Sequence, residues 1–260
     1  EILMSGPLAG APAVRKLRLY REGRFELTPS ASFSILDEYN RGILFGATLN
    51  YNFADWLAFG VWGAFGGVQY PTALTEHIED RHKGRNCGNA DNANEIDCKL
   101  TAVNLPTNGK LRNQTGQISW VAAPQLTITP FRGKISMFSS LFVDTELHFL
   151  LGAAMVGLSE RADCAGDTCT FKHSRASRST FTATFGLGLT FFTHKWGGIA
   201  LDWRALPLSR NTGGFDTAGT GPNDDFPDLR ISSKDREFKM NQLITVGYSI
   251  FLPFDYRVSE

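Results

Sequence analysis

The stretch FTATFGLGLTF, residues 181–191, alternates between two kinds of side chain. Its odd positions carry phenylalanine, leucine or alanine, and its even positions carry threonine or glycine. A period of two places these sets on opposite faces of a β-strand. A half-buried strand of a water-soluble protein carries charged or long polar side chains on its wet face, and this strand carries none. The small face therefore suits a crowded interior, and the large apolar face suits lipid.

The same alternation recurs along the chain and defines a set of candidate strands. They span residues 25–35, 43–53, 57–66, 118–128, 141–151, 181–191, 199–204 and 239–252. A tilted strand needs about 9–11 residues to cross a bilayer, and most of these runs have that length. The sequence has no apolar run of about 18 residues, so it predicts no membrane-spanning helix.

The connections between the candidate strands alternate in length. Short turns are predicted at AD (54–55), FRGK (131–134) and THKW (193–196), and long loops at 69–116, 159–177 and 208–236; LDEYNRG (36–42) is a modest loop on the long side. Short periplasmic turns opposite long extracellular loops are typical of outer-membrane barrels. We therefore predict an all-β fold: an eight-stranded antiparallel transmembrane β-barrel over residues 25–253, an N-terminal periplasmic segment over 1–24 and a C-terminal tail over 254–260.

Aromatic residues gather near the ends of the candidate strands, where interfacial girdles are expected. The predicted short-turn rim carries Phe53, Trp56, Phe131, Phe192, Trp196, Phe254 and Tyr256. The opposite rim carries Phe33, Trp120, Phe181, Trp203 and Phe238. A soluble lipocalin-like barrel, the alternative from a different class, would instead turn its large residues inward around a ligand: Phe45, Phe59, Phe185, Leu187 and Ile244.

The overall charge gives no indication of a nucleic-acid partner, because 26 basic residues balance 26 acidic ones. The opening EILMSGPLAG lacks the basic start and apolar core of a signal peptide, and we interpret the sequence as a mature form.

Four cysteines lie in two polar segments between strands. Cys87 with Cys98 and Cys164 with Cys169 are predicted to form two local disulfides in an oxidising compartment, although three connectivities are formally possible. The alternative is a zinc site with His77, His82 or His173, but the spacings do not fit the usual zinc patterns. The segments NCGNADNANEIDC (86–98) and GPNDDFPD (221–228) are rich in oxygen ligands but lack calcium-loop spacing. No metal or cofactor is predicted.

The chain resembles a known family over most of its length, and two segments carry the resemblance. GPLAGAPAVRKLRLYREGRFELTPSASFSILDEYNRG (6–42), followed by YNFADWLAFGVWGAFG (51–66), is similar to the myxobacterial-type outer-membrane β-barrel domain among the small eight-stranded barrels of Gram-negative bacteria. The resemblance implies an outer-membrane location and this fold, and no defined activity.

The last strand also resembles the signal that outer-membrane assembly machinery reads. Thr245 would be the polar residue, Gly247 the glycine, and Ile250 and Leu252 the terminal apolar residues. The chain departs from that pattern by continuing through PFDYRVSE. The resemblance implies the assembly machinery and outer-membrane lipid as partners.

Charged side chains are expected to point into the barrel from several strands. The predicted lumen charge network is Glu26, Asp144, Glu146, His148, Asp202, Arg204 and Lys239. Eight strands leave room only for side chains, so this set is expected to form structural ion pairs that hold the lumen shut. A gated ion path through Asp144, Glu146, His148 and Arg204 is one alternative. A lipid-modifying enzyme that uses His148 as a base is another, but no nucleophile is specified by spacing.

The sequence thus predicts a structural anchor or interaction scaffold that has a closed lumen and is not an enzyme. A protein partner in the membrane or periplasm is one expectation. The basic residues before the first strand, Arg15, Lys16, Arg18, Arg21 and Arg24, are candidates to plug the barrel mouth or to meet a periplasmic partner or anionic headgroups.

Overall fold

The computed structural model describes residues 21–83, 111, 114–137, 141–161, 175–194, 196–219 and 231–254, without the side chains of residues 81–83, 134–137 and 141–142. Both cysteine pairs, His173, the two segments rich in Asn and Asp, and most of the N-terminal segment lie outside this part of the chain.

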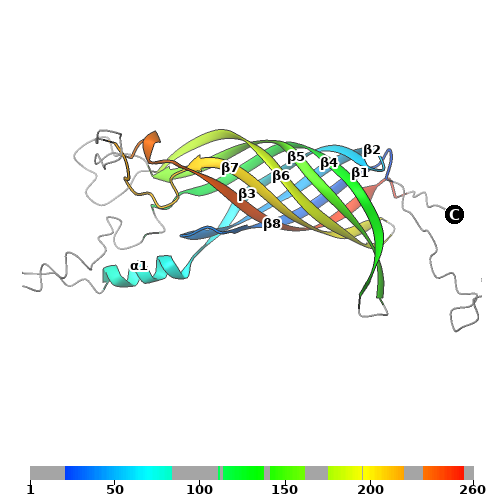
Figure 1. Ribbon diagram of the computed structural model, residues 1–260, viewed down its shortest axis with the longest axis horizontal. Coiled ribbons are helices and arrows are strands. Elements are labelled where there is room, and N and C mark those ends of the chain that lie inside the picture. The colour runs from blue at the N-terminus through cyan, green and yellow to red at the C-terminus, as the bar shows by residue number, and fades with distance from the viewer. Residues whose placement is uncertain are drawn as a thin grey trace, which may run out of the picture.

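Eight antiparallel strands close into a barrel in which each strand pairs with its neighbours in the sequence and β1 pairs with β8 (Figure 1). The strands are β1 (Phe25–Ile35), β2 (Asn40–Ala54), β3 (Leu57–Pro71), β4 (Gln117–Met137), β5 (Leu141–Arg161), β6 (Arg175–His194), β7 (Gly197–Arg210) and β8 (Glu237–Leu252). The predicted fold class is confirmed. We call the barrel end with the 54–57 and 194–197 connections the short-turn end, and the other the loop end.

The strands extend further than the sequence pattern predicts, and one predicted turn is wrong. The segment 131–134 lies within strand β4, whose pairing with β5 continues through Arg132↔Glu146 to Met137↔Leu141. The register shifts between Ile128 and Phe131, around a proline that lacks an N–H, and the ladder then resumes. Apolar alternation ends where a strand leaves lipid, but backbone hydrogen bonding continues into water. The alternation therefore marks the membrane-embedded part of a strand better than its ends.

Two short helical elements lie at the loop end. Helix α1 (Ala73–Lys83) follows β3 directly and extends beyond the barrel wall (Figure 1), and the sequence analysis did not predict it. The 3-10 helix η2 (Ser233–Asp235) precedes β8. Among the described residues, neither helix has the length and apolar character needed to cross a bilayer.

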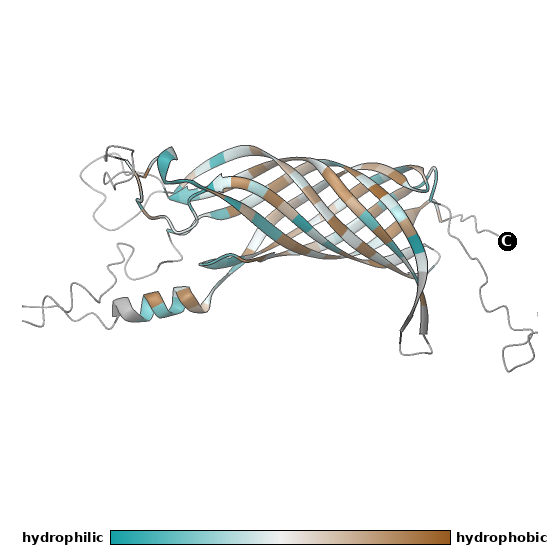
Figure 2. Cartoon of the chain, in the orientation of Figure 1, coloured by the Kyte–Doolittle hydropathy of each residue, from teal (hydrophilic) through white to brown (hydrophobic). Residues whose placement is uncertain are grey.

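The two faces of the barrel wall differ as the alternation predicts. Large apolar side chains cover the outside, among them Phe45, Leu49, Phe59, Val61, Leu151, Leu187, Ile199 and Leu201. Figure 2 shows hydrophobic and less hydrophobic residues alternating along the strands. Phe45 and Phe59 point outward and are about half-exposed, which contradicts the lipocalin-like alternative. Such an apolar exterior requires lipid, because a soluble monomer rarely exposes so large a patch.

The aromatic girdle at the short-turn end agrees with the sequence analysis except at one position. Phe53, Trp56, Phe131, Trp196 and Phe254 are exposed there. Phe192 instead shares the inward face of β6 with the buried Thr190, and its ring stacks on that of Phe251 with a centroid separation of 5.8 Å. The prediction for Phe192 was wrong because it considered only how far along the strand the residue lies, and not which face of the strand its side chain occupies. Tyr256 lies outside the described residues.

Candidate functional site

Two neighbouring regions of the barrel interior differ in their chemistry. The half towards the short-turn end is polar and includes Glu26, Thr28, Asn50, Gln125, Thr127, Glu146, His148, Thr190, Asp202, Arg204 and Ser249. Towards the loop end lies an apolar level, which consists of Leu44, Trp62, Ala64, Val121, Ala123, Ala154, Val156, Leu158, Leu206, Leu208 and Leu243. Buried polar residues such as Glu160 and Arg210 lie beyond it. We call the polar region the polar half and the apolar level the apolar plug.

The centre of the polar half is a hydrogen bond that spans three strands. His148 of β5 and Asp202 of β7 both pair with Gly188 of β6, which lies between them. Because Gly188 has no side chain, His148 Nε2 reaches Asp202 Oδ1 over it at 2.9 Å. The glycine positions of the opening sequence motif thus provide space for contacts inside the lumen.

Arg204 links this pair to the opposite wall. Its guanidinium lies 3.1 Å from Asp202 Oδ2 and donates to Gln125 Oε1 at 2.6 Å. The guanidinium carbon also lies 4.5 Å from the centroid of the Trp62 ring. Arg204 therefore occupies the boundary between the polar half and the apolar plug, where its charge is compensated on one side and its planar face packs on the other.

The short-turn end of the polar half is occupied by Arg21, which the sequence analysis named as a candidate to plug the barrel mouth and left out of the lumen charge network. Its guanidinium forms ion pairs with both Glu26 of β1 and Glu146 of β5. The backbone N–H of Arg21 donates to Asp55 Oδ1 at 2.7 Å, and Gly23, at φ +76°, forms the turn that leads into β1. Arg21 is only 3% exposed, so this cation is held inside the barrel mouth.

Arg24 and Phe251 complete the same mouth. The Arg24 guanidinium donates to the carbonyl oxygens of Phe251 at 3.2 Å and Pro253 at 3.0 Å. Phe251 is fully buried, with the Arg21 guanidinium 4.7 Å from its ring centroid and Phe192 stacked against it. Two residues of the N-terminal segment thus contact the last strand and the lumen.

The space left inside the polar half is small. A cavity of about 20 Å³ lies among the charged residues. Such a volume holds about one water molecule. The apolar plug is packed tightly, with Trp62, Ala123, Val156, Leu206 and Leu243 all fully buried.

The predicted lumen charge network is brought together in part. Glu26, Glu146, His148, Asp202 and Arg204 all line the central cavity. Asp144 lies one inward position closer to the short-turn end than Glu146 and is half-buried. Lys239 lies at the loop end, where it pairs with Glu38 at 3.1 Å and Glu237 at 3.3 Å. Lys239 has the inward parity, but it belongs to the part of β8 beyond the apolar plug and so does not join the network.

The residues of the predicted assembly signal occupy both faces of β8. Thr245 is buried inside, within 2.8 Å of Ser32 Oγ across the closing β1–β8 pair, while Gly247 pairs with Ser30 of β1. Ile250 and Leu252 lie on the outward face. Among the described residues, no group of three or more His, Cys, Asp or Glu side chains is arranged to hold a metal ion.

The sequence analysis missed the apolar plug, and it named Arg21 as a candidate to plug the barrel mouth without predicting its ion pairs with Glu26 and Glu146. Arg21 precedes the first apolar alternation, so only its place in a basic cluster singled it out. The alternation places the plug residues on the inward face of their strands. It does not show that they lie at the same level in the barrel, because that depends on how the strands are aligned. That level follows from the strand stagger.

Comparisons with known proteins add the following. No family model matches the chain, and no curated protein matches it. Among solved structures, the N-terminal β-barrel domain of Pseudomonas aeruginosa OprF is 7% identical, with a TM-score of 0.44, covering 89% of this chain and 98% of that one. The P. aeruginosa outer membrane protein OprG is 10% identical, with a TM-score of 0.39, covering 90% and 97%. Ail, the attachment invasion locus protein of Yersinia pestis, is 12% identical, with a TM-score of 0.37, covering 89% and 99%.

The architecture itself defines the class of protein. A closed antiparallel barrel with an even number of strands, an apolar exterior, aromatic girdles and a polar interior is the structure of an outer-membrane β-barrel. The bacterial outer membrane, the predicted location, is therefore where this chain belongs. The resemblance to the myxobacterial-type family stays a prediction.

Proposed function

We propose that this protein is a structural anchor or interaction scaffold of the outer membrane, with a closed lumen and with its long loops presented outside the cell. The observation that carries the proposal is the apolar plug, whose buried side chains come from β2, β3, β4, β5, β7 and β8 and meet inside the barrel. An ion crossing this level would lose most of its water and meet few polar groups, such as the Ser32 hydroxyl, which is costly.

The Arg21 contacts support the same function from the other end. A buried guanidinium paired with two carboxylates blocks the mouth with a fixed charge, and removal of Arg21 would leave the buried Glu26 carboxylate without its ion-pair partner. Through Arg21 the N-terminal segment is fastened to the barrel. We propose that residues 1–20 bind a protein partner in the periplasm.

A narrow ion channel is the second candidate, because charged side chains line half of the lumen. It would require the apolar plug to open. A lipid-modifying activity would require substrate to reach His148, beside which about 20 Å³ is open. We therefore propose no enzymatic activity.

Conductance in planar bilayers tests the closed lumen. We expect no unitary currents from the full chain, and none from Arg204→Ala or Glu146→Ala, since the plug remains. The informative variant is Trp62→Ala with Leu206→Ala, which thins the plug, and the matched control is Phe59→Ala on the outer face of the same strand. Stable currents from the unaltered protein that change in Arg204→Ala would establish the channel instead.

A pull-down from native outer membrane tests the scaffold role with the same preparation. A partner retained in constant ratio by the full chain, and lost on deletion of residues 1–20 or of one long loop, would support the proposal and locate the contact. If no partner is retained with the loops and the N-terminal segment intact, the scaffold role fails even though the lumen is closed.

A further inference from the structure

Strands β4 and β5 form a hairpin that leaves the barrel wall at the short-turn end. The ladder between β3 and β4 ends at Ile128, yet β4 continues to Met137 and stays paired with β5. The ladder between β5 and β6 ends at Asp144. Beyond these points the two strands form a ladder only with each other, among the residues that the structure describes. We call residues 131–137 and 141–147 the β4–β5 hairpin.

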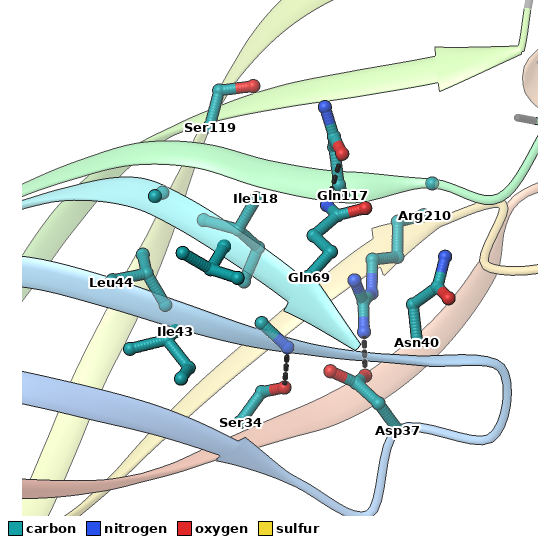
Figure 3. Close-up of a pocket in the computed structure, with 15 residues that line it drawn as sticks. Ser34, Asp37, Asn40, Ile43, Leu44, Gln69, Gln117, Ile118, Ser119 and Arg210 are labelled. Carbon is teal, nitrogen blue, oxygen red and sulfur yellow. Dashed lines mark hydrogen bonds and ion pairs between the residues drawn. The ribbon is translucent and has the colours of Figure 1, made fainter. Parts of the chain in front are cut away.

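The wall supports this hairpin only at its root. At the loop end β3 and β4 also separate before they end, but there a side-chain hydrogen bond from Gln69 to Gln117 bridges them (Figure 3). At the short-turn end, the backbone N–H of Thr129 donates to the Trp56 carbonyl oxygen at 2.8 Å. Further along the hairpin β3 gives no support, because β3 begins at Leu57.

A bulge at the root bends the hairpin. Thr129 and Pro130 of β4 lie opposite the single residue His148 of β5, where the ladder shifts register. Such a bulge bends the strand that carries the extra residue. Figure 1 shows the hairpin directed away from the barrel axis. Phe131 and Trp56, both exposed in the aromatic girdle, lie at the root. Because such girdles mark the level of the headgroups, the hairpin starts at that level and runs along the membrane.

The two faces of the hairpin differ in polarity, since residues that pair directly across two strands lie on the same face. One face carries the pairs Phe131↔Leu147, Gly133↔Thr145, Ile135↔Val143 and Met137↔Leu141. The other face carries the pairs Arg132↔Glu146, Lys134↔Asp144 and Ser136↔Phe142. The register therefore places every charged residue of the hairpin on the second face. We call the first the apolar face and the second the polar face.

The apolar face is the outward one. On the polar face, Arg132 lies on the lumen side: its Nε is 3.4 Å from Glu146 Oε2, and its Nη2 donates to the Asp55 carbonyl oxygen. Glu146 itself is buried in the polar half. On the apolar face, Phe131 is 66% exposed and Leu147 is half-buried. The apolar face thus continues the lipid-facing surface of the wall, and where the hairpin bends outward this face turns towards the membrane.

We infer that the apolar face of the β4–β5 hairpin binds the phospholipids of the periplasmic leaflet. A two-stranded hairpin alone is at best marginally stable in water, so its outer part needs a surface to pack on. The surface continuous with its apolar face already contacts lipid, so the bilayer is the occupant that this geometry supports. The apolar side chains then lie at the boundary between headgroups and acyl chains, as in other interfacial amphipathic segments, and the polar face is turned to the periplasm.

Paramagnetic broadening of methyl resonances tests this contact. The full chain, with labelled isoleucine, leucine and valine methyl groups, is placed in nanodiscs whose phospholipid carries a nitroxide at the top of one acyl chain. A parallel sample contains a water-soluble gadolinium chelate. Ile199, which faces lipid, and Leu36, which is 75% exposed at the loop end, are the references. We expect the nitroxide to broaden Ile135 and Val143 as it broadens Ile199, and the chelate to broaden Leu36 alone.

Substitutions at two adjacent residues form a matched pair. Ile135→Asp places a carboxylate on the apolar face, and Ser136→Asp places the same group on the polar face. We expect the nitroxide broadening of Val143 to be lost in Ile135→Asp and kept in Ser136→Asp. Unchanged broadening of Ile199 in both variants shows that the barrel is folded.

Three results would overturn the inference. Broadening of Ile135 and Val143 by the chelate, as at Leu36, would place the apolar face in water. Broadening by neither agent would mean that protein covers this face. Loss of the Val143 broadening in Ser136→Asp as well would contradict the assignment of the faces. None of these measurements involves a protein partner, so the lipid contact and the proposed scaffold role stand or fall separately.

Discussion

The guanidinium of Arg204 stacks on the indole of Trp62, 4.5 Å from the ring centroid, at the level where the barrel interior changes from polar to apolar. Both side chains are buried. A cation over an aromatic face is stabilised by the ring quadrupole, and more strongly when water is excluded. This contact couples the ion pairs to the apolar plug, so a change in either is expected to affect the other.

Trp62→Ala tests how much the plug contributes to stability. Truncation of a fully buried tryptophan typically costs about 3–5 kcal/mol, and here it also removes the surface on which Arg204 packs. We expect a loss of that order in the free energy of unfolding, measured by urea titration in micelles. Phe59→Ala is the control on the lipid-facing side, where lipid chains fill the space. Equal losses in the two variants would contradict a packed plug.

Arg21→Ala tests the fastening of the N-terminal segment. The substitution leaves Glu26 and Glu146 without this guanidinium, and breaking one side of a buried pair costs about 3–5 kcal/mol. We expect a lower unfolding free energy, partly restored by adding Glu26→Gln. Arg41→Ala, at an exposed position of the loop end, should change stability by less than about 0.5 kcal/mol. An unchanged unfolding free energy in Arg21→Ala would mean that these ion pairs contribute nothing to stability.

Gly188→Ala tests the contact between His148 and Asp202. A Cβ at position 188 would clash with Asp202 Oδ1 and His148 Nε2, so the contact between these two side chains has to open. We expect a loss of about 1–3 kcal/mol, as for other insertions into a packed interior, and a displaced His148 imidazole resonance in NMR spectra. Gly133→Ala, where space is free, should leave both unchanged. An unshifted resonance in Gly188→Ala would show that the ring does not occupy this position.

The contacts of Asp235 predict that the connection before β8 is less stable in acid. Burial alone would raise the pKa of Asp235, but backbone N–H groups of Ser232, Thr217 and Ala218 donate to its carboxylate and lower the pKa below its ordinary value of 3.8. A carboxyl group with a depressed pKa stabilises the folded form above 3.8, and this contribution is lost as the pH falls through the lower, native value.

Hydrogen exchange of the 217 and 218 amides measures this effect. We expect protection to be constant at neutral pH, after correction for the intrinsic rate, and to fall below about pH 4. Asp235→Ala should lack the protection at every pH. Asp216→Ala, one residue from this contact, is the control. Protection that persists in Asp235→Ala would refute the role of the carboxylate.

The fold could be predicted from the sequence because lipid imposes a strict period of two on the membrane-embedded strands. The alternating positions of residues such as Phe45 and Phe59 were enough to predict which face of the barrel wall points outward. The extension of β4 past residues 131–134 could not be predicted, because outside lipid both faces of a strand tolerate polar residues. The separation of Lys239 from the network depends on strand stagger, which one sequence does not specify.

The ring is closed by pairing β1 with β8, from Phe25↔Leu252 to Ile35↔Gln242, and side-chain hydrogen bonds such as Thr28 to Ser249 at 2.8 Å connect the same two strands. Before that pairing forms, two strand edges carry unsatisfied N–H and C=O groups that lipid cannot accept. Closure therefore has to wait until the ribosome has made the chain as far as Leu252. The barrel therefore cannot close on a partly synthesised chain, so its folding follows translation.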